Sequence, residues 1–402
     1  MKLHWQIFIA LVAGATAGYV LPHSVPYYDW VGTLFINALC MLIVPIMFFS
    51  ITNSLIGVQR SGDGSLRRLG LKTFLLYVIT MIIAIVTGLV LVNWINPGGN
   101  IQVSTPAELP FNAENVPVRT IITDFIPKNI FAAFAQNNTI PVIVVAFLCG
   151  ITIPKISEKG RTVLSDFIES GLELVLKLTT IVIRFSPIGI FAIVAHQFAL
   201  VGNVWSLIHT MLLYVLTVTA GLFIHAFVWL PLMLRFYKVR PFRHLKNMIT
   251  PLLTAFSTAS SGATLPLTLH AVEHKDAVSP RVTNFTVPLG AAINMNGTAL
   301  LECVAVIFIA QAYGIHLSIV QQIVVAFVSL LCAIGSAAVP MAALVMMALI
   351  LNVVGLPLEG IGLVIGVDRI LDMMRTAVNV YGDTCVAVMV AKSEGETLTV
   401  DV

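Results

Sequence analysis

Long apolar runs constrain the fold of this chain more than any other feature. Many of them reach or exceed the roughly 20 residues that a helix needs to cross the hydrocarbon core of a bilayer. Of the 402 residues, 58% are hydrophobic and only 10% are charged, whereas a soluble domain usually carries about 25% charged residues. Most of the surface therefore cannot face water, and a large soluble enzyme is excluded.

The apolar runs predict six conventional membrane spans, at 4–22, 30–56, 70–95, 138–154, 167–200 and 206–234. Basic residues concentrate in the loops that follow the second, fourth and sixth spans, which all lie on one side of the membrane. The connections on the other side are nearly free of positive charge, apart from Arg119 and Lys128. By the positive-inside rule, we expect a multi-pass protein of the plasma or inner membrane with a cytoplasmic N-terminus.

A cleaved signal peptide is the alternative interpretation of residues 1–22. A basic start, an apolar stretch and the small residues at 13–17 fit that pattern. Removal of the segment would, however, disturb the distribution in which the later loops on one side of the membrane are basic and those on the other side are not. A first transmembrane helix is therefore favoured.

Residues 322–357 do not fit the pattern of single membrane spans, because they contain no charge over 36 positions. A single helix of that length would be about 54 Å long, nearly twice the hydrocarbon thickness, and two full spans with a connection do not fit either. The middle of the run holds small residues that end in the helix-breaking Pro340. A re-entrant hairpin of two half-length helices fits the length.

Residues 244–275 show the same arrangement, with a tip rich in Ser and Thr before Pro266. Such a cluster can also be an ordinary helix-packing surface, which is the alternative for either segment alone. Each hairpin precedes a long span with a polar interior, at 283–312 and 358–391. Paired interrupted segments point to a transporter binding site, because irregular backbone at membrane depth is tolerated only inside protein or beside a wet cavity.

The span at 283–312 carries the sequence Asn-Met-Asn-Gly-Thr at 294–298. An unwound turn there would aim backbone carbonyls and Asn oxygens at a cation; the alternative is a glycine kink whose polar groups bond to neighbouring helices. Glu302 follows in apolar surroundings, where desolvation favours the neutral form of a carboxyl. Glu302 is therefore a candidate proton carrier.

The last span carries a polar stripe, which is the most specific signal in the chain. Its members are spaced 4, 3, 4 and 4 residues apart and fall within about 80° of helix arc. They are Asp368, Asp372, Arg375, Asn379 and Asp383. Charges at membrane depth are costly unless they are paired or hydrated, so the stripe faces the protein interior.

The balance of charge on this stripe indicates its ligands. Three Asp against one Arg leave a surplus of negative charge that an external cation would neutralise, and the planar guanidinium of Arg375 suits bidentate binding of a carboxylate. The alternative is a structural ladder of ion pairs, in which Asp372 neutralises Arg375 and Arg369 reaches Asp368.

Motifs for other activities are missing from the sequence. We find no phosphate loop, nucleophile elbow, metalloprotease helix or nucleotide-binding fingerprint, and the five cysteines have neither disulfide nor zinc-site spacing. We therefore expect no enzyme activity, no organic cofactor and no nucleic-acid partner. The energy for transport should come from an ion gradient.

Three segments resemble the dicarboxylate/amino acid:cation symporter family, also called the glutamate transporter family. They are the Ser-rich tip that ends at 262–266, the polar segment at 294–299 and the stripe from Asp368 to Asp383. The resemblance runs over nearly the whole chain. It implies an all-α polytopic membrane protein with eight transmembrane helices and two re-entrant helical hairpins, which forms a homotrimer and works as an elevator-type transporter.

The resemblance also implies a division of the chain into a scaffold and a moving transport domain. The expected units are scaffold helices 1 and 2 at 1–69, transport-domain helix 3 at 70–96, an extracellular linker with scaffold helices 4 and 5 at 97–200, transport-domain helix 6 at 201–242, and both hairpins with helices 7 and 8 at 243–402.

By the same resemblance, Arg375 would bind the side-chain carboxylate of the substrate and Asp372 its ammonium group. Further polar contacts are expected from Ser260, Ser261, Thr298, Thr376 and Asn379. An acidic substrate follows, because family members for neutral amino acids replace this arginine.

A family sodium site matches in full, with carbonyl groups at Gly290, Asn294 and Asn379 and the carboxylate of Asp383. A second family sodium site is retained only in part. Its Tyr77 and Thr80 match, but Met81 replaces a Ser and Asn296 replaces an Asp, so we expect a degenerate cation site there.

Two further comparisons with the family concern the hairpins, which would gate the site, and the residue that would carry a proton. The segment at 338–343 has less glycine than the family usually has, and Ala259 and Met373 stand where many members place a second Arg. Glu302 stands where proton-coupled animal members keep a Glu.

The main hypothesis is a secondary active symporter that imports aspartate or glutamate, coupled to sodium at the Asp383 site and to protons through Glu302. A purely proton-coupled carrier of acidic amino acids or C4 dicarboxylates is the alternative within transport. A channel or anion conductor and an intramembrane enzyme with paired aspartates are alternatives from other classes. Asp368 and Asp372 lie on one helix, each with an Arg close by, which suits a proton-sharing dyad poorly.

Overall fold

The computed structural model describes residues 3–59, 64–99, 101, 126–136, 139–200, 204–335 and 342–402. Within these ranges every regular element is a helix, apart from one isolated bridge between Val239 and Asp401. The predicted all-α class is confirmed. The tip of the predicted second hairpin at 338–340 and Arg119 lie outside the described residues.

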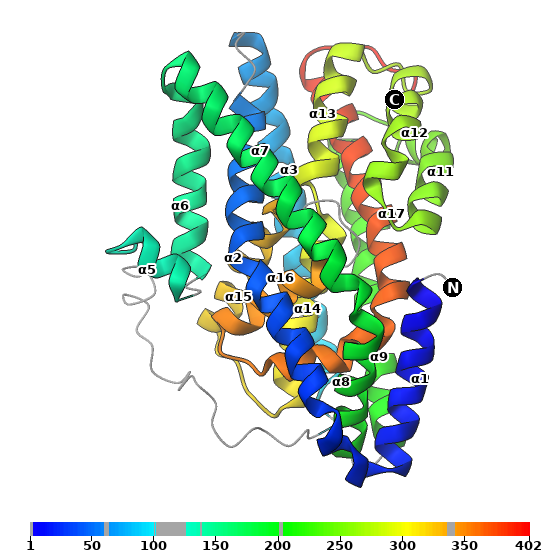
Figure 1. Ribbon diagram of the computed structural model, residues 1–402. Coiled ribbons are helices and arrows are strands. Elements are labelled where there is room, and N and C mark those ends of the chain that lie inside the picture. Colours follow the sequence, from blue (N-terminus) through cyan, green and yellow to red (C-terminus); the bar gives the residue numbers. More distant parts are fainter. Residues whose placement is uncertain are drawn as a thin grey trace.

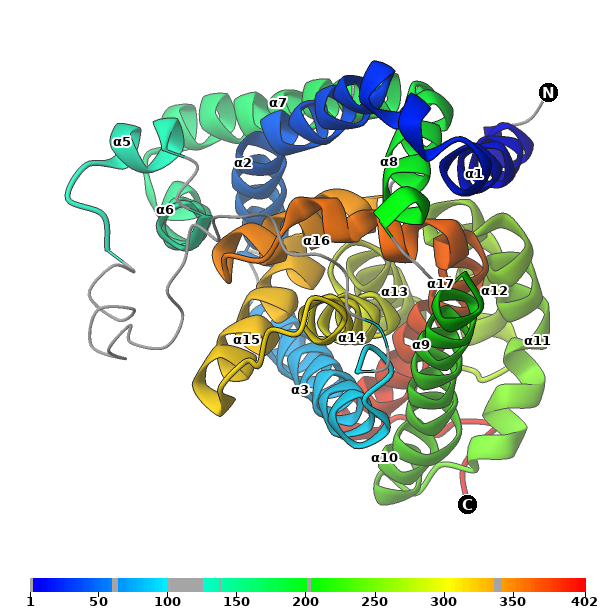
Figure 2. The same cartoon turned by 90° about the horizontal axis from the view of Figure 1, so that it is seen from below.

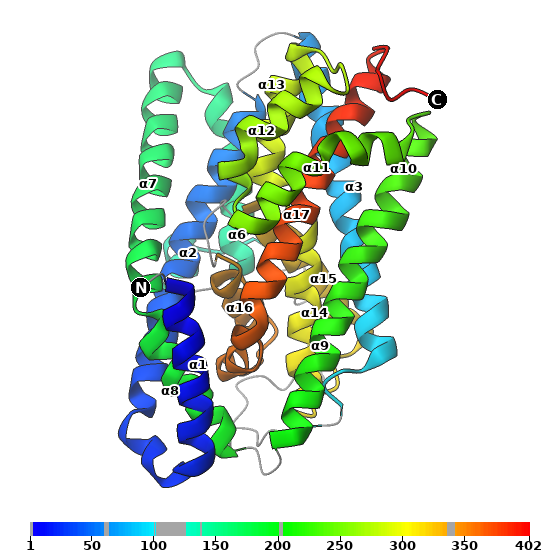
Figure 3. The same cartoon turned by 90° about the vertical axis from the view of Figure 1, so that its right-hand side faces the viewer.

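The helices form two layers (Figures 1 and 2). The first layer contains α1 (Leu3–Val20), α2 (Asp29–Gln59), α5 (Ile130–Ala135), α6 (Thr139–Thr152), α7 (Glu158–Arg184) and α8 (Ser186–Leu200). Within it α1 packs along α8, and α2 packs against α6, α7 and α8. Figure 3 shows α1, α2, α7 and α8 on one side of the molecule.

The second layer contains every helix of the predicted site. Its members are α3 (Gly64–Ile95), α9 (Val204–Ile224), α10 (Leu230–Phe236), α11 (Pro241–Thr258), α12 (Ser261–His274), α13 (Pro280–Ile293), α14 (Asn296–Ala312), α15 (Ile319–Gly335), α16 (Ala342–Val353) and α17 (Ile361–Ser393). The central helix is α14, which is almost wholly buried and packs against α3, α9, α15, α16 and α17.

Four helical segments among the described residues are long and apolar enough to cross a membrane: Asp29–Gly57, Arg68–Ile95, Trp205–Phe236 and Pro280–Ala312. The shorter apolar helices are Trp5–Val20, Pro141–Lys155, Ile319–Ile334 and Ala343–Val353. Helix α17 has 33 residues and would also be long enough, but it carries the charged stripe. These helices agree with a polytopic membrane protein; the number of eight spans stays a prediction.

The predicted span at 167–200 is bent in the structure. Helices α7 and α8 meet at an angle of 56°, so together they account for a fifth candidate span among the described residues. Pro187 explains the break, because it has no N–H to donate to the carbonyl one turn earlier and its ring clashes with that carbonyl.

Both predicted hairpins consist of two helices that pack against each other, α11 with α12 and α15 with α16. Ala259 ends α11 in a left-handed conformation, with a φ of 50°. Ser260 then begins α12, where its hydroxyl accepts a hydrogen bond from the N–H of Ala263 at 3.2 Å. The chain thus turns back within two residues, at the Ser-rich tip that the sequence indicates.

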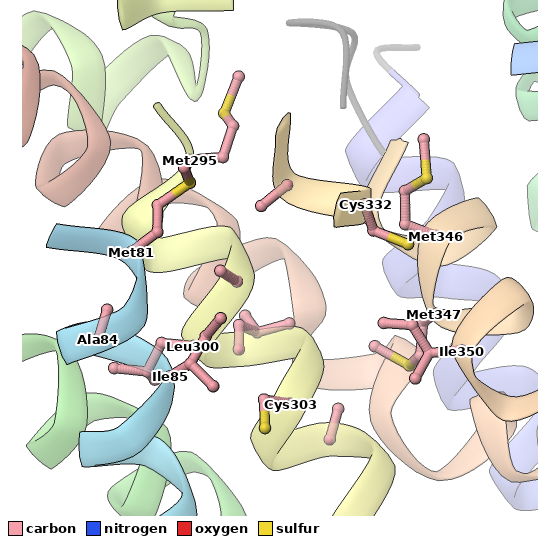
Figure 4. Packing of buried hydrophobic residues seen from close by; sticks show 14 of the residues in the cluster. Met81, Ala84, Ile85, Met295, Leu300, Cys303, Cys332, Met346, Met347 and Ile350 are labelled. Atoms are coloured by element: carbon pink, nitrogen blue, oxygen red, sulfur yellow. The ribbon is translucent and has the colours of Figure 1, made fainter. Parts of the chain in front are cut away.

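Small side chains let the inner helices approach closely. A Cβ on Gly88 of α3 would lie 2.9 Å from Val304 and 3.2 Å from Leu300 of α14. Figure 4 shows Ala84 and Ile85 of α3 beside Leu300, and Cys332 of α15 beside Met346 of α16. Apolar side chains make up most of the packing around α14, so the few polar groups in this layer stand out as functional candidates.

The contact between α1 and α8 generates a test of the first layer. Gly14 and Gly18 have the small-xxx-small spacing of close membrane helix pairs, and a Cβ on Gly14 would lie 2.6 Å from the carbonyl oxygen of Phe191. A Cβ on Gly18 would overlap the carbonyl of Ala195.

We expect Gly18→Ala to lower the thermal stability, since overpacking of this kind costs about 1–3 kcal/mol. Gly57→Ala is the matched control, because Gly57 lies in α2 with nothing within 4 Å of its Cβ position. Alanine at 57 should raise stability by about 0.5–1 kcal/mol. Thermal unfolding of the detergent-solubilised protein measures both variants, and equal effects would contradict the tight contact.

Candidate functional site

The helix that is predicted at 283–312 is interrupted in the structure, in front of the polar stripe of α17. Helix α13 ends at Ile293, and α14 begins at Asn296. The N–H of Asn294 still donates to the carbonyl of Gly290 at 2.8 Å, whereas the N–H of Gly297 donates to the side-chain oxygen of Asn379 at 2.7 Å. A side chain of α17 therefore caps the start of α14, and the predicted unwound turn is present.

Asp383 lies behind this turn, with 2% of its surface exposed. Its Oδ1 accepts a hydrogen bond from the side-chain amide of Asn294 at 2.8 Å. A Cβ on Gly290 would lie 2.5 Å from Asp383 Oδ1 and would overlap the hydroxyl of Tyr77. Because Gly290 has no side chain, the carboxylate of Asp383 can lie close to the main chain of α13. Carboxylate and carbonyl oxygens are ligands that suit a hard cation.

The residues of the predicted degenerate cation site also lie together. The Thr80 hydroxyl is 2.8 Å from the carbonyl of Tyr77 and 3.2 Å from Oδ1 of Asn296, while the Tyr77 hydroxyl donates to the carbonyl of Thr286 at 2.8 Å. All three side chains are buried, and the Nδ2 group of Asn296 has no hydrogen-bond partner.

Met81 adds a thioether at the same place. Figure 4 shows it next to Met295 of the interrupted segment. An Asp at 296 would bring a negative charge and a Ser at 81 a hydroxyl oxygen. The amide and the thioether found there are weaker ligands for a hard cation.

Arg375 and Asp372 form a buried ion pair on α17. Arg375 donates from Nε and Nη2 to Oδ1 of Asp372, at 2.9 and 2.8 Å. The Thr376 hydroxyl donates to the carbonyl of Asp372 at 2.7 Å. The third guanidinium nitrogen, Nη1 of Arg375, is buried without any hydrogen-bond partner.

The ladder of ion pairs that served as the alternative to a ligand site is present only in part. Asp372 does pair with Arg375, but Nη1 of Arg369 lies 3.5 Å from Oδ2 of Asp372 instead of reaching Asp368. The closest acidic group to Arg369 is thus the carboxylate of Asp372, because position 369 is three residues before 372 and so lies close to it on the helix surface. A closed ladder would also satisfy every buried donor, and Nη1 of Arg375 is unsatisfied.

Thr298 and Asn379 lie beside this ion pair. Nδ2 of Asn379 is 3.2 Å from the Thr298 hydroxyl. A Cβ on Gly297 would lie 2.8 Å from the carbonyl oxygen of Arg375, so α14 and α17 are in direct backbone contact here. The structure therefore brings Thr298, Arg375 and Asn379 together as the sequence predicts.

The Ser-rich tip precedes α12, which packs against α13 and α17. Ser261 is buried, and the hydroxyl of Ser260 is already engaged as the cap of α12. The carbonyl of Ser260 accepts from the Thr264 hydroxyl at 2.8 Å. A direct contact of these serines with a solute stays a prediction.

Glu302 lies one turn after Thr298 on α14 and is fully buried. Neither oxygen of its carboxyl group has a hydrogen-bond partner. An ionised carboxylate without partners is very costly in such a place. The carboxyl is therefore expected to be neutral, as a proton carrier between two states requires.

Sequence reasoning missed Gly382, which precedes Asp383. A Cβ there would overlap Nδ2 of Asn296 and lie 3.0 Å from Nδ2 of Asn294. A glycine inside a helix costs about 1 kcal/mol of stability relative to alanine. Its presence in the middle of α17 was the available signal that another segment of the protein approaches the helix closely at this point.

Comparison with known proteins confirms the family. The model of the sodium:dicarboxylate symporter family matches residues 3–393, from α1 to the end of α17. The proton/sodium-glutamate symport protein of Bacillus caldotenax is 33% identical over 98% of this chain and 95% of its own length. The proton/glutamate-aspartate symporter of Bacillus subtilis is 34% identical over 97% and 94%, and the excitatory amino acid transporter 3 of Mus musculus is 31% identical over 100% and 88%. The chain belongs to the sodium:dicarboxylate symporter family.

Proposed function

We propose that the protein is a secondary active symporter that imports aspartate or glutamate, coupled to sodium and to protons. The observation that carries the proposal is the buried Arg375, whose Nη1 has no partner while its Nε and Nη2 bind Asp372. The names of the relatives, which are glutamate and aspartate symporters and excitatory amino acid transporters, support the substrate class. The family consists of transporters, so no enzyme activity is indicated.

Binding of an acidic amino acid would exchange partners at Arg375 and would add one net negative charge, because the substrate carries two carboxylates and one ammonium group. The substrate's side-chain carboxylate would bind the guanidinium, and its ammonium group would bind the carboxylate of Asp372 that Arg375 now neutralises. A C4 dicarboxylate has no ammonium group and would leave Asp372 as an unpaired buried charge. This argument favours an amino acid over the alternative substrate.

Sodium would bind at Asp383, which the carbonyl groups at Gly290, Asn294 and Asn379 would complete. The close approach of Gly290 to Asp383 and the interruption after Ile293 support this site. The Thr80 cluster supplies no carboxylate of its own, which supports a reduced number of sodium sites. Glu302 would carry a proton.

We also propose the elevator mechanism and the homotrimer. The separation into two layers supports the mechanism, because α1, α2 and α6 to α8 lie in one layer and every candidate ligand lies in the other. The first layer would be the scaffold that joins the three copies. The basic loops between the spans would lie in the cytoplasm, together with the N-terminus.

Replacement of Arg375 tests the substrate assignment. We expect Arg375→Ala to lose at least about 2–5 kcal/mol of binding free energy for aspartate and glutamate, which is about thirtyfold or more in affinity. Arg369→Ala is the control, because Arg369 is 45% exposed and only approaches Asp372 at 3.5 Å. Calorimetry on the purified protein measures both variants, and unchanged affinity in Arg375→Ala would refute the carboxylate contact.

Replacement of Gly290 tests the cation site. We expect Gly290→Ala to abolish the sodium dependence of uptake into proteoliposomes, because the added methyl group fills the space between Asp383 and Tyr77. Gly57→Ala should retain the dependence. A Gly290→Ala protein that unfolds at the same temperature as the wild type and still needs sodium would rule out a cation at Asp383.

Replacement of Glu302 tests the proton. Glutamine imitates the protonated carboxyl, so Glu302→Gln should abolish uptake driven by an imposed pH gradient while sodium-driven uptake continues. Uptake of labelled aspartate under each gradient separately gives the result. Undiminished pH-driven uptake in the variant would remove Glu302 from the proton pathway.

A further inference from the structure

A second buried polar pair lies outside the substrate and cation residues. His244 is in the first turn of α11, and Asp276 is in the link between α12 and α13. Both residues are 0% exposed. His244 Nδ1 is 2.6 Å from Asp276 Oδ2, and Nδ2 of Asn247 donates to Asp276 Oδ1 at 2.7 Å. The pair thus joins the two ends of the first hairpin, near the end of the molecule that carries the C-terminus (Figure 1).

The other nitrogen of His244 reaches α17. Its Nε2 is 3.1 Å from the hydroxyl oxygen of Thr384, the residue after Asp383. The Thr384 hydroxyl has a single hydrogen, and its shorter bond, 2.8 Å, goes to the carbonyl oxygen of Tyr381. When the hydroxyl donates to Tyr381, only Nε2–H of His244 can supply the hydrogen of the remaining contact.

The hydrogen count at Nδ1 places a second proton on the ring. The carboxylate of Asp276 accepts from Asn247 at one oxygen, and it accepts from His244 Nδ1–H at the other. Both ring nitrogens are then donors, which is the state of an imidazolium. Its positive charge and the negative charge of Asp276 cancel, as burial of both groups requires.

We propose that His244 and Asp276 form a proton-binding site that controls the hydrogen bonding of α17 next to Asp383. When the proton leaves to water, Nε2 of His244 becomes an acceptor, and the Thr384 hydroxyl turns from Tyr381 to donate to it. The carbonyl of Tyr381 then loses its second hydrogen bond. Because Thr384 follows Asp383 directly, protonation of His244 biases the backbone that presents the Asp383 carboxylate to a cation.

Other titratable groups face the pair from the neighbouring elements. On α17, the ring of Tyr381 stacks on the His244 ring at 5.7 Å, and Asp276 acts electrostatically on both Tyr381 and Cys385. Lys275 donates instead to the carbonyl of Asn247 at 3.2 Å.

The C-terminal segment covers the link that carries Asp276. The N–H of Thr399 donates to the main-chain carbonyl of Asp276 at 3.1 Å, and Leu398 and Val400 are buried. Its acidic groups have other partners, since Asp401 pairs with Lys392 and Glu396 binds Ser279. Asp276 is thus the one carboxylate in contact with His244 among the described residues.

Nitrogen NMR of the protein labelled at histidine tests the protonation state without any assumption about transport. Near neutral pH, we expect a signal from a histidine with both ring nitrogens protonated that is absent from His244→Gln. His274→Gln is the matched control, because His274 is exposed on α12 of the same hairpin. A neutral imidazole at His244 throughout about pH 5–8, the range in which histidines usually titrate, would overturn the proposal.

A second variant keeps this test decisive if His244→Gln does not fold. Thr384→Val removes the acceptor at Nε2 and leaves the ring in place. The imidazolium then lacks one hydrogen bond, so the doubly protonated signal should vanish at a lower pH than in the wild type. A titration midpoint that does not move would contradict the assigned hydrogen-bond directions.

The coupling to Asp383 rests on the proposed function and needs a transport measurement. In the Glu302→Gln background, the apparent sodium affinity of aspartate uptake should still vary with pH, by at most about tenfold per pH unit for one coupled proton. His244→Gln should abolish this variation, and His274→Gln should preserve it. The same pH dependence in all three proteins would overturn the coupling, whereas a lack of sodium-driven uptake in the wild type would refute the proposed function and leave the NMR result standing.

Discussion

The contact between Arg375 and Asp372 is the interaction on which the second layer depends. Two charges at this depth are tolerated only while each neutralises the other or a ligand. Their helix must therefore be enclosed, and α17 is packed by α9, α11, α13 and α14. Because Nη1 of Arg375 is still unsatisfied within this enclosure, the pair is a structure that a charged solute can complete.

Glycine makes the enclosure possible. Gly290, Gly297 and Gly382 all lie where a Cβ would collide with a functional group or with backbone of the facing helix. The interruption between α13 and α14 at Asn294 adds to these contacts. It frees the main-chain N–H of Gly297, which then donates to the side chain of Asn379 on α17. The proposed cation site and the proposed substrate site are thus two consequences of one close helix contact.

Local sequence patterns predicted a large part of this arrangement. The spacing of the polar residues predicted which face of α17 is buried. The Asn-Met-Asn-Gly-Thr segment predicted the interruption between α13 and α14, and the charge-free run at 322–357 predicted the pair of helices α15 and α16. The pairing of Arg369 with Asp372 and the 56° bend at Phe185 were not predicted. The contact of His244 with Thr384, 140 residues apart, has no local signature at all. Such contacts are fixed by how helices pack, and neither periodicity nor composition encodes that.

Adjacent residues of α17 contact different parts of the second layer, and this gives the helix a means of coupling. Asp383 binds Asn294 at the helix interruption, while Thr384 contacts His244 at the start of the first hairpin. A change of partner at Thr384 alters the hydrogen bonds of the same turn that holds Asp383. A proton at His244 and a cation at Asp383 would therefore act on one element with two hydrogen-bonded arrangements, and thermodynamic linkage would then require that each changes the affinity for the other by the same factor.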